Sequence, residues 1–175
     1  MTSHEQVLSL LVPAAVVLGC AALAARPAGG PGAVAVAVVV GTIGALGPSP
    51  SDAPTRRPTA RWLMTVAVGI GAFAAARALS PMVTPVTLAA VAITSVAEEV
   101  FFRRLVYGWL AALGPGLAVA GAAAAFAAVH LPAWGMAAVP LNLAAGLLFG
   151  WQRWATGGWS ASALTHIVAN LFQLG

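Results

Sequence analysis

Long apolar runs alternate along the chain with short breaks that contain glycine or proline. A helix needs roughly 20 mostly apolar residues to span the hydrocarbon core of a bilayer. On that criterion the pattern predicts seven helices, of which the second and the fifth are short. They cover residues 7–25, 33–46, 62–79, 86–113, 117–130, 136–154 and 159–174. We therefore expect an all-α, polytopic transmembrane helical bundle.

The breaks between these runs are the predicted helix ends, because glycine and proline are the residues at which helices commonly stop. They lie at residues 26–32, 47–58, 80–81, 114–116, 131–132 and 156–158. No internal repeat with a clear period is visible in the sequence.

Composition agrees with an integral membrane protein. Of the 175 residues, 61% are hydrophobic and only 7% are charged, far from the balance of a soluble globular domain. We expect one integral membrane domain, residues 1–175. All eight basic residues are arginines, and they lie near the ends of apolar runs, as topology determinants do, which excludes a nucleic-acid-binding patch. The lack of lysine, together with many alanines and glycines, favours a bacterial cytoplasmic (inner) membrane. The single cysteine, Cys20, excludes an intrachain disulfide and a thiolate metal cluster.

Two of the four acidic residues, Glu98 and Glu99, are adjacent inside the fourth apolar run. An ionisable side chain at membrane depth costs roughly 2.5 to 3.5 kcal/mol on insertion scales, so it indicates a candidate functional site. Glu99 and Arg103 share a helix face and can form an ion pair, whereas Glu98 points about 100° away. We interpret Glu98 as a candidate general base and Glu99 as the partner of Arg103. Alternatively, Arg103 and Arg104 neutralise both carboxylates in a structural network.

Two further pairs with four-residue spacing lie on later helices. Phe126 and His130 are near the end of the fifth run, and His166 and Asn170 lie in the last. Because lipid cannot hydrogen-bond these polar side chains, they must face protein or a water-filled cavity. Each could be a polar contact between helices, which is how we interpret Asn142. If they converge with the carboxylates, imidazole and amide could stabilise an oxyanion beside a water-activating group.

Three spacings thus occur in order on successive apolar segments. They are Glu98-Glu99-x-x-x-Arg103, Phe126-x-x-x-His130 and His166-x-x-x-Asn170. This order resembles the CAAX-protease and bacteriocin-processing (CPBP, Abi-type) family of glutamate-dependent intramembrane endopeptidases. The stretches GLLFGW at 146–151 and TGG at 156–158 are also similar to the segment before the last motif in that family. The resemblance implies a catalytic core at about 86–174, with the active site among the last four helices.

The resemblance also implies roles for the residues. Glu98 would activate water with help from His130, while His166 and Asn170 would form the oxyanion site. Two glutamates, two histidines and an asparagine could bind zinc. The H-E-x-x-H spacing of zinc peptidases is absent, however, so we expect a metal-free glutamate mechanism with no cofactor.

In the same comparison, Glu99 and Arg103 would brace the first helix of the core. The reaction would be hydrolysis of a peptide bond near the C-terminus of a membrane-anchored protein, within the lipid bilayer. Family members trim prenylated CAAX tails, cut bacterial C-terminal sorting tails, or take part in bacteriocin processing and immunity. A compact bacterial chain fits the sorting-tail enzymes at least as well as the CAAX enzymes.

Two alternatives are not enzymes. A small proton-coupled transporter would use intramembrane glutamate and histidine as a proton relay, although the chain is short and lacks a visible repeat. A catalytically silent immunity or scaffold protein of the same family is the second. Against it, every position that the family uses for catalysis holds the expected residue.

Overall fold

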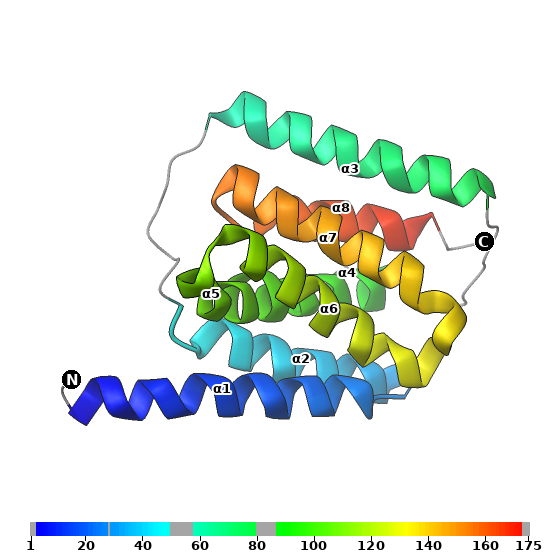
Figure 1. The fold of residues 1–175 in the computed structure, drawn as a ribbon. Coiled ribbons are helices and arrows are strands. Elements are labelled where there is room, and N and C mark those ends of the chain that lie inside the picture. Colours follow the sequence, from blue (N-terminus) through cyan, green and yellow to red (C-terminus); the bar gives the residue numbers. More distant parts are fainter. Residues whose placement is uncertain (1–2, 28, 50–57, 80–86, 173–175) are drawn as a thin grey trace.

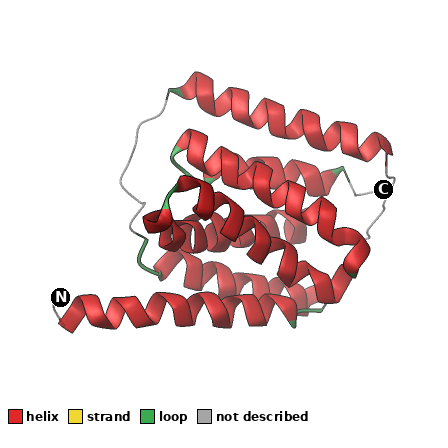
Figure 2. Ribbon diagram, viewed as in Figure 1, coloured by secondary structure: helices red, strands yellow, loops and turns green. Residues whose placement is uncertain are grey.

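The computed structural model describes residues 3–27, 29–49, 58–79 and 87–172. All regular secondary structure in these ranges is helical (Figure 2). The α-helices are α1 (Ser3–Ala24), α2 (Gly30–Leu46), α3 (Thr59–Leu79), α4 (Leu88–Glu99), α5 (Tyr107–Leu110), α6 (Pro115–Trp134), α7 (Val139–Thr156) and α8 (Ser160–Leu171). A π-helix, η1 (Val100–Val106), joins α4 to α5, and the 3₁₀ turns η2 (Ala111–Leu113) and η3 (Met136–Ala138) follow α5 and precede α7. Each of the seven predicted runs corresponds to helix, so the predicted all-α polytopic bundle is confirmed.

The helix that carries the two glutamates lies in the middle of the bundle. Figure 1 shows α1 and α2 side by side on one outer face and α3 on the opposite face. Between them, α4 packs on α2 on one side and on α8 on the other, and α6 packs along α7. Helix α3 covers α7 and α8. The central position of α4 buries its C-terminal end among helices from both halves of the chain.

Glycine and proline define most of the described helix boundaries, as the sequence indicates. Proline occupies the first turn of α2, α6 and α7, where its missing N–H costs no hydrogen bond. Gly114 and Gly157, at the predicted breaks 114–116 and 156–158, have φ of 103° and 75°, a region that favours glycine. Thr87 caps α4, since its hydroxyl accepts from the Ala90 amide at 3.2 Å.

The expected break at residues 131–132 is wrong. Helix α6 continues through Pro132 to Trp134 and ends at Gly135, whose φ is 72°. Pro132 removes one hydrogen bond in the last turn of the helix, and a single lost bond so near the end does not stop it. The glycine ends the helix instead, and its amide donates to the Leu131 carbonyl at 2.9 Å.

The fourth predicted run is helical from Leu88 to Leu113, but it changes its hydrogen-bond pattern directly after Glu99. The prediction of one continuous helix did not include this π-helical stretch. Most of the predicted breaks at 47–58 and 80–81, the start of the fourth run at residue 86 and the end of the last run at residue 174 lie outside the described residues.

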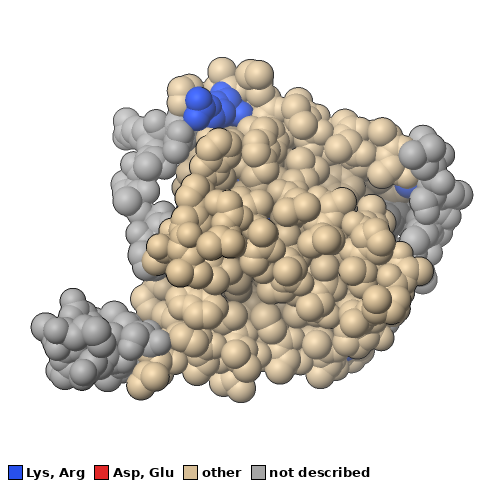
Figure 3. Space-filling view, viewed as in Figure 1, with Lys and Arg blue, Asp and Glu red and all other residues tan. Residues whose placement is uncertain are grey.

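The outer surface is apolar and the interior carries charge, the reverse of a soluble protein. Leu10, Leu46 and Met136 are 73%, 82% and 72% exposed, and the face in Figure 3 shows almost no charged atoms away from the start of α3. Within the described residues, two helical stretches are long and apolar enough to cross a membrane, Thr59–Arg77 and Pro115–Trp134. Helices α1 and α2 contribute shorter apolar stretches. Lipid-facing leucine and methionine explain this surface.

Helix α2 approaches α4 and η1 so closely that only glycine fits at two of its positions. A Cβ at Gly41 would lie 2.8 Å from the Cβ of Ala97, and one at Gly44 would lie 2.8 Å from the Cα of Phe101. Small residues allow such backbone contact between membrane helices. This packing fixes the segment of chain that begins with the two glutamates.

We expect Gly44→Ala to lower the free energy of unfolding by about 1–3 kcal/mol, because the added methyl group overlaps the Phe101 backbone. Gly71→Ala in α3 is the matched control, since a Cβ there meets nothing within 4 Å. Replacing glycine with alanine at an uncrowded helix position raises the free energy of unfolding by up to about 1 kcal/mol. Thermal unfolding of both variants in detergent tests the packing; equal midpoints would contradict it.

Candidate active site

Glu99 lies at the centre of a fully buried cluster of charged and aromatic side chains. Its Oε2 is 3.2 Å from Arg103 Nε, and both side chains are 0% exposed. The two atoms are close enough for an ion pair, although they are not aligned for a hydrogen bond. Glu99 Oε1 lies 3.0 Å from His166 Nδ1, which donates to it. The predicted pair of Glu99 and Arg103 is therefore present, with His166 as an additional partner.

Besides its ion pair with Glu99, Arg103 is held by contacts from two other helices, α6 and α7. Its Nη2 donates to the Gly146 carbonyl of α7 at 3.1 Å. Its guanidinium carbon lies 4.7 Å from the centre of the Phe126 ring and 5.1 Å from that of Phe149, within the range of cation–π attraction. Gly146 and Phe149 belong to the GLLFGW stretch. They contribute to the site as supports of the buried cation.

Glu98 faces different partners, as the angular separation of adjacent helical residues predicts. Its Oε2 lies 3.6 Å from His130 Nε2, and its Oε1 contacts Arg26 Nη1. His130 Nδ1 is 2.7 Å from the Phe126 carbonyl. Because a carbonyl only accepts, Nδ1 carries the proton in this contact and Nε2 is left as an acceptor. Glu98 Oε2 and His130 Nε2 are thus two neighbouring acceptors.

His166 and Asn170 reach α4 one turn apart. His166 stacks on Phe149 with ring centres 4.9 Å apart, and Asn170 Nδ2 donates to Ser95 Oγ at 3.0 Å. Ser95 is one turn before Glu99 on α4 and is fully buried. The four candidate catalytic residues are therefore gathered around the end of α4, although the hydrogen bond of His166 goes to Glu99 rather than to Glu98.

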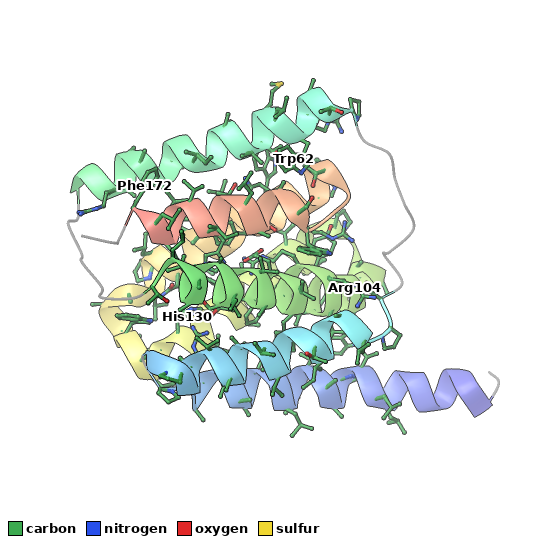
Figure 4. The ribbon with its side chains drawn as sticks, turned by 180° about the vertical axis from the view of Figure 1, so that it is seen from behind. Trp62, Arg104, His130 and Phe172 are labelled. Carbon is green, nitrogen blue, oxygen red and sulfur yellow. The ribbon has the colours of Figure 1, made fainter. Side chains whose placement is uncertain are left out.

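The contacts of Arg104 and Asn142 differ from those that the sequence suggests. Arg104 donates to the carbonyl of Gly47, at 2.8 Å, and to that of Gly44, at the end of α2. Figure 4 shows it at the opposite end of the bundle from His130. Asn142 donates to the Ala138 carbonyl of its own helical segment at 3.1 Å. Arg104 thus stabilises helix packing away from the carboxylates, and the contact of Asn142 is local.

Arg26 is the site residue that sequence reasoning missed. It follows α1 directly and is separated from Glu98 by 72 positions, so no local spacing connects them. The available signal was a count, because an arginine at the end of an apolar run has few carboxylates to pair with in a chain that has four acidic residues. The π-helix that begins at Val100 was also missed, and such stretches are frequent at functional sites.

Within the described residues, no group of three or more histidine, cysteine, aspartate or glutamate side chains is arranged to hold a metal ion. The glutamates bind arginine and histidine instead.

Comparisons with known proteins place this arrangement in a family. Neither the curated proteins nor the solved structures gave a match. A family model described as type II CAAX prenyl endopeptidase Rce1-like matches residues 80–172, more than half of the chain, and these residues include both glutamates and both histidines of the site. The chain therefore belongs to the Rce1-like family of type II CAAX prenyl endopeptidases, which are integral membrane proteases.

Proposed function

We propose that the protein is an intramembrane endopeptidase that uses Glu98 as the general base to hydrolyse a peptide bond near the C-terminus of membrane-anchored proteins. The observation that carries this proposal is the pair of acceptors, Glu98 Oε2 and His130 Nε2, 3.6 Å apart. Among the described residues, Oε2 is buried and has no hydrogen-bond partner. One water can contact both atoms, and a water that donates to two bases is polarised for attack.

In the proposed reaction, Glu98 takes a proton from this water while the water oxygen bonds to the carbonyl carbon of the substrate. Negative charge then develops on the carbonyl oxygen. Asn170 can donate its second amide hydrogen to this oxygen, and His166, whose Nδ1 proton goes to Glu99, can donate from Nε2 when its ring is the imidazolium. Collapse of the tetrahedral intermediate breaks the carbon–nitrogen bond. Glu98 returns its proton to the leaving nitrogen, so that water has been added across the peptide bond.

Glu99 and Arg103 have a supporting role in this scheme. Their ion pair and the contact of His166 with Glu99 fix the backbone on which Glu98 sits. We propose that the reaction needs no metal or other cofactor, since the carboxylates are engaged by arginine and histidine.

The substrate is proposed to be a membrane-tethered protein with a CAAX-type or bacterial sorting tail. Support comes from the setting of the site, which lies inside a bundle whose described helices expose leucine and methionine, as lipid-facing surfaces do. We further propose that the chain forms one domain that crosses a bacterial cytoplasmic membrane several times. Lipid and the tethered substrate are then its partners, and nucleic acid is not.

Purified protein in liposomes, mixed with peptides that carry one membrane span and a short C-terminal tail, tests the function. We expect the wild type to release the tail and His130→Ala to lower kcat/KM by about 10²-fold, because the water loses one of its two acceptors. Asn142→Ala is the control and should match the wild type. The Asn142 amide donates to the Ala138 carbonyl, four residues earlier in the same helical segment. Mass spectrometry of the products locates the cut.

Three outcomes would contradict the proposal. Intact tails with wild-type protein would reject the protease, and proton flux in the same liposomes would then support the transporter. Full activity in His130→Ala would remove the shared water. Activity abolished by a chelator and restored by zinc would replace the metal-free mechanism.

A further inference from the structure

The guanidinium of Arg26 bridges the proposed base and its histidine partner. Arg26 Nη1 contacts Glu98 Oε1, and Nη2 lies 3.3 Å from His130 Nε2. The acceptor atom on which the proposed water activation depends is therefore bonded to arginine in this structure. Arg26 belongs to the turn after α1 and lies outside residues 80–172, which the family model matches.

This bridge and the proposed reaction exclude each other. His130 Nε2 has one lone pair, which cannot accept a hydrogen bond from Arg26 and from the reacting water at once. Catalysis therefore requires the guanidinium to leave His130. A largely covered arginine that leaves its carboxylate is best compensated by another anion, because an unpaired charge in a low-dielectric setting is disfavoured.

Of the Arg26, Glu98 and His130 side chains, that of Arg26 is the most exposed. Its side chain is 14% exposed, against 5% for Glu98 and 9% for His130. His130 lies at the end of the bundle where α1 passes into α2 (Figure 4). An approaching anion would thus meet Arg26 before it could reach the carboxylate or the imidazole.

We propose that Arg26 is a positioning and specificity-determining residue that binds the free C-terminal carboxylate of the substrate tail and thereby releases His130 and Glu98. This rests on the proposed function, in which the cut bond lies near the C-terminus. A residue spans at most about 3.6 Å, so a tail of two or three residues places its carboxylate no more than about 7–11 Å beyond the bond, and the guanidinium swings away from Glu98 and His130 to bind it. The planar guanidinium binds a carboxylate through two parallel hydrogen bonds.

Two peptides that differ only at the C-terminus, one a free acid and one an amide, test this in liposomes of neutral phosphatidylcholine. We expect the wild type to cleave the acid about 10- to 100-fold more efficiently, the range for a hydrogen-bonded charge pair. The preference should appear in kcat as well as in KM, because binding the carboxylate frees the base. A pure binding subsite would change KM alone.

In Arg26→Gln the ratio of acid to amide cleavage should fall to about one, and in Arg26→Lys part of the preference should return. Arg77→Gln is the matched control, since Arg77 lies at the end of α3 and donates to the Phe172 carbonyl. It should keep the wild-type ratio. Thermal unfolding in detergent shows whether each variant is folded. If Arg26→Gln does not fold, the ratio of acid to amide cleavage by the wild type tests the proposal by itself.

The outcomes separate the two proposals. Cleavage of neither peptide by the wild type, in neutral liposomes and in liposomes that contain phosphatidylglycerol, overturns the protease function and the role of Arg26 with it. Equal cleavage of both peptides by the wild type overturns the role of Arg26 alone. Activity that ignores the peptide terminus but requires anionic phosphatidylglycerol would also overturn it, since Arg26 would then bind a lipid phosphate.

Discussion

Glu98→Gln is expected to lower kcat by up to about 10⁴-fold while the bundle stays folded. Glutamine has nearly the same shape as glutamate but cannot take a proton from water, and loss of a general base costs typically 10²- to 10⁴-fold. The substitution also removes the charge that faces Arg26, whose partly exposed side chain can turn towards an anion or water. KM should change little, because the base acts in the transition state.

Single-turnover cleavage in liposomes measures this effect, with thermal unfolding in detergent as the check on folding. The adjacent Glu99→Gln is the contrasting variant, because it changes the carboxylate that binds Arg103 and His166. Glu99→Gln should lower the unfolding midpoint, whereas Glu98→Gln should lower kcat. Wild-type turnover in a folded Glu98→Gln protein would remove Glu98 from the mechanism.

The second large effect is expected for the buried ion pair. Arg103→Met should destabilise the protein by about 3–5 kcal/mol, because it leaves the fully buried Glu99 carboxylate without its cation. Glu99→Gln leaves Arg103 with the Gly146 carbonyl and the aromatic rings, and should be destabilising in the same range. The double variant Glu99→Gln/Arg103→Met should be more stable than either single variant, since no uncompensated charge remains.

Unfolding midpoints of the two single variants and the double variant form a double-mutant cycle that gives the coupling energy directly. Arg61→Met, at an exposed position at the start of α3, is the control for loss of an arginine and should change stability by less than about 0.5 kcal/mol. Effects of Glu99→Gln and Arg103→Met that simply add would show that the two side chains do not stabilise each other.

The sequence was sufficient for features that depend on local periodicity. Apolar runs indicated all seven helical segments, because helix length and hydrophobicity are set within each run. The pair of Glu99 and Arg103 followed from four-residue spacing on one helix. The different directions of Glu98 and Glu99 followed from the rotation of about 100° between adjacent residues.

Other features depend on contacts or backbone details that the sequence pattern does not contain. His166 meets Glu99 across 67 positions and Arg26 meets Glu98 across 72, so only the packing of α4 on α8 and the position of the turn after α1 bring these side chains together. Hydropathy is also insensitive to the hydrogen-bond register, which is why the π-helix after Glu99 was not predicted. Pro132 led to a wrong helix end, because α6 continues through the proline and ends at Gly135.

The turn after α1 has an evolutionary consequence. The groups proposed to break the bond all lie within residues 80–172, whereas the guanidinium that covers them comes from the N-terminal part of the chain. In the proposed scheme, bond cleavage and selection of the substrate tail are thus encoded in separate stretches. Substitutions near Arg26 would change which tail endings release the base while Glu98 and His130 stay the same. Relatives with the same residues at 80–172 would then differ in selectivity through the turn after their first helix.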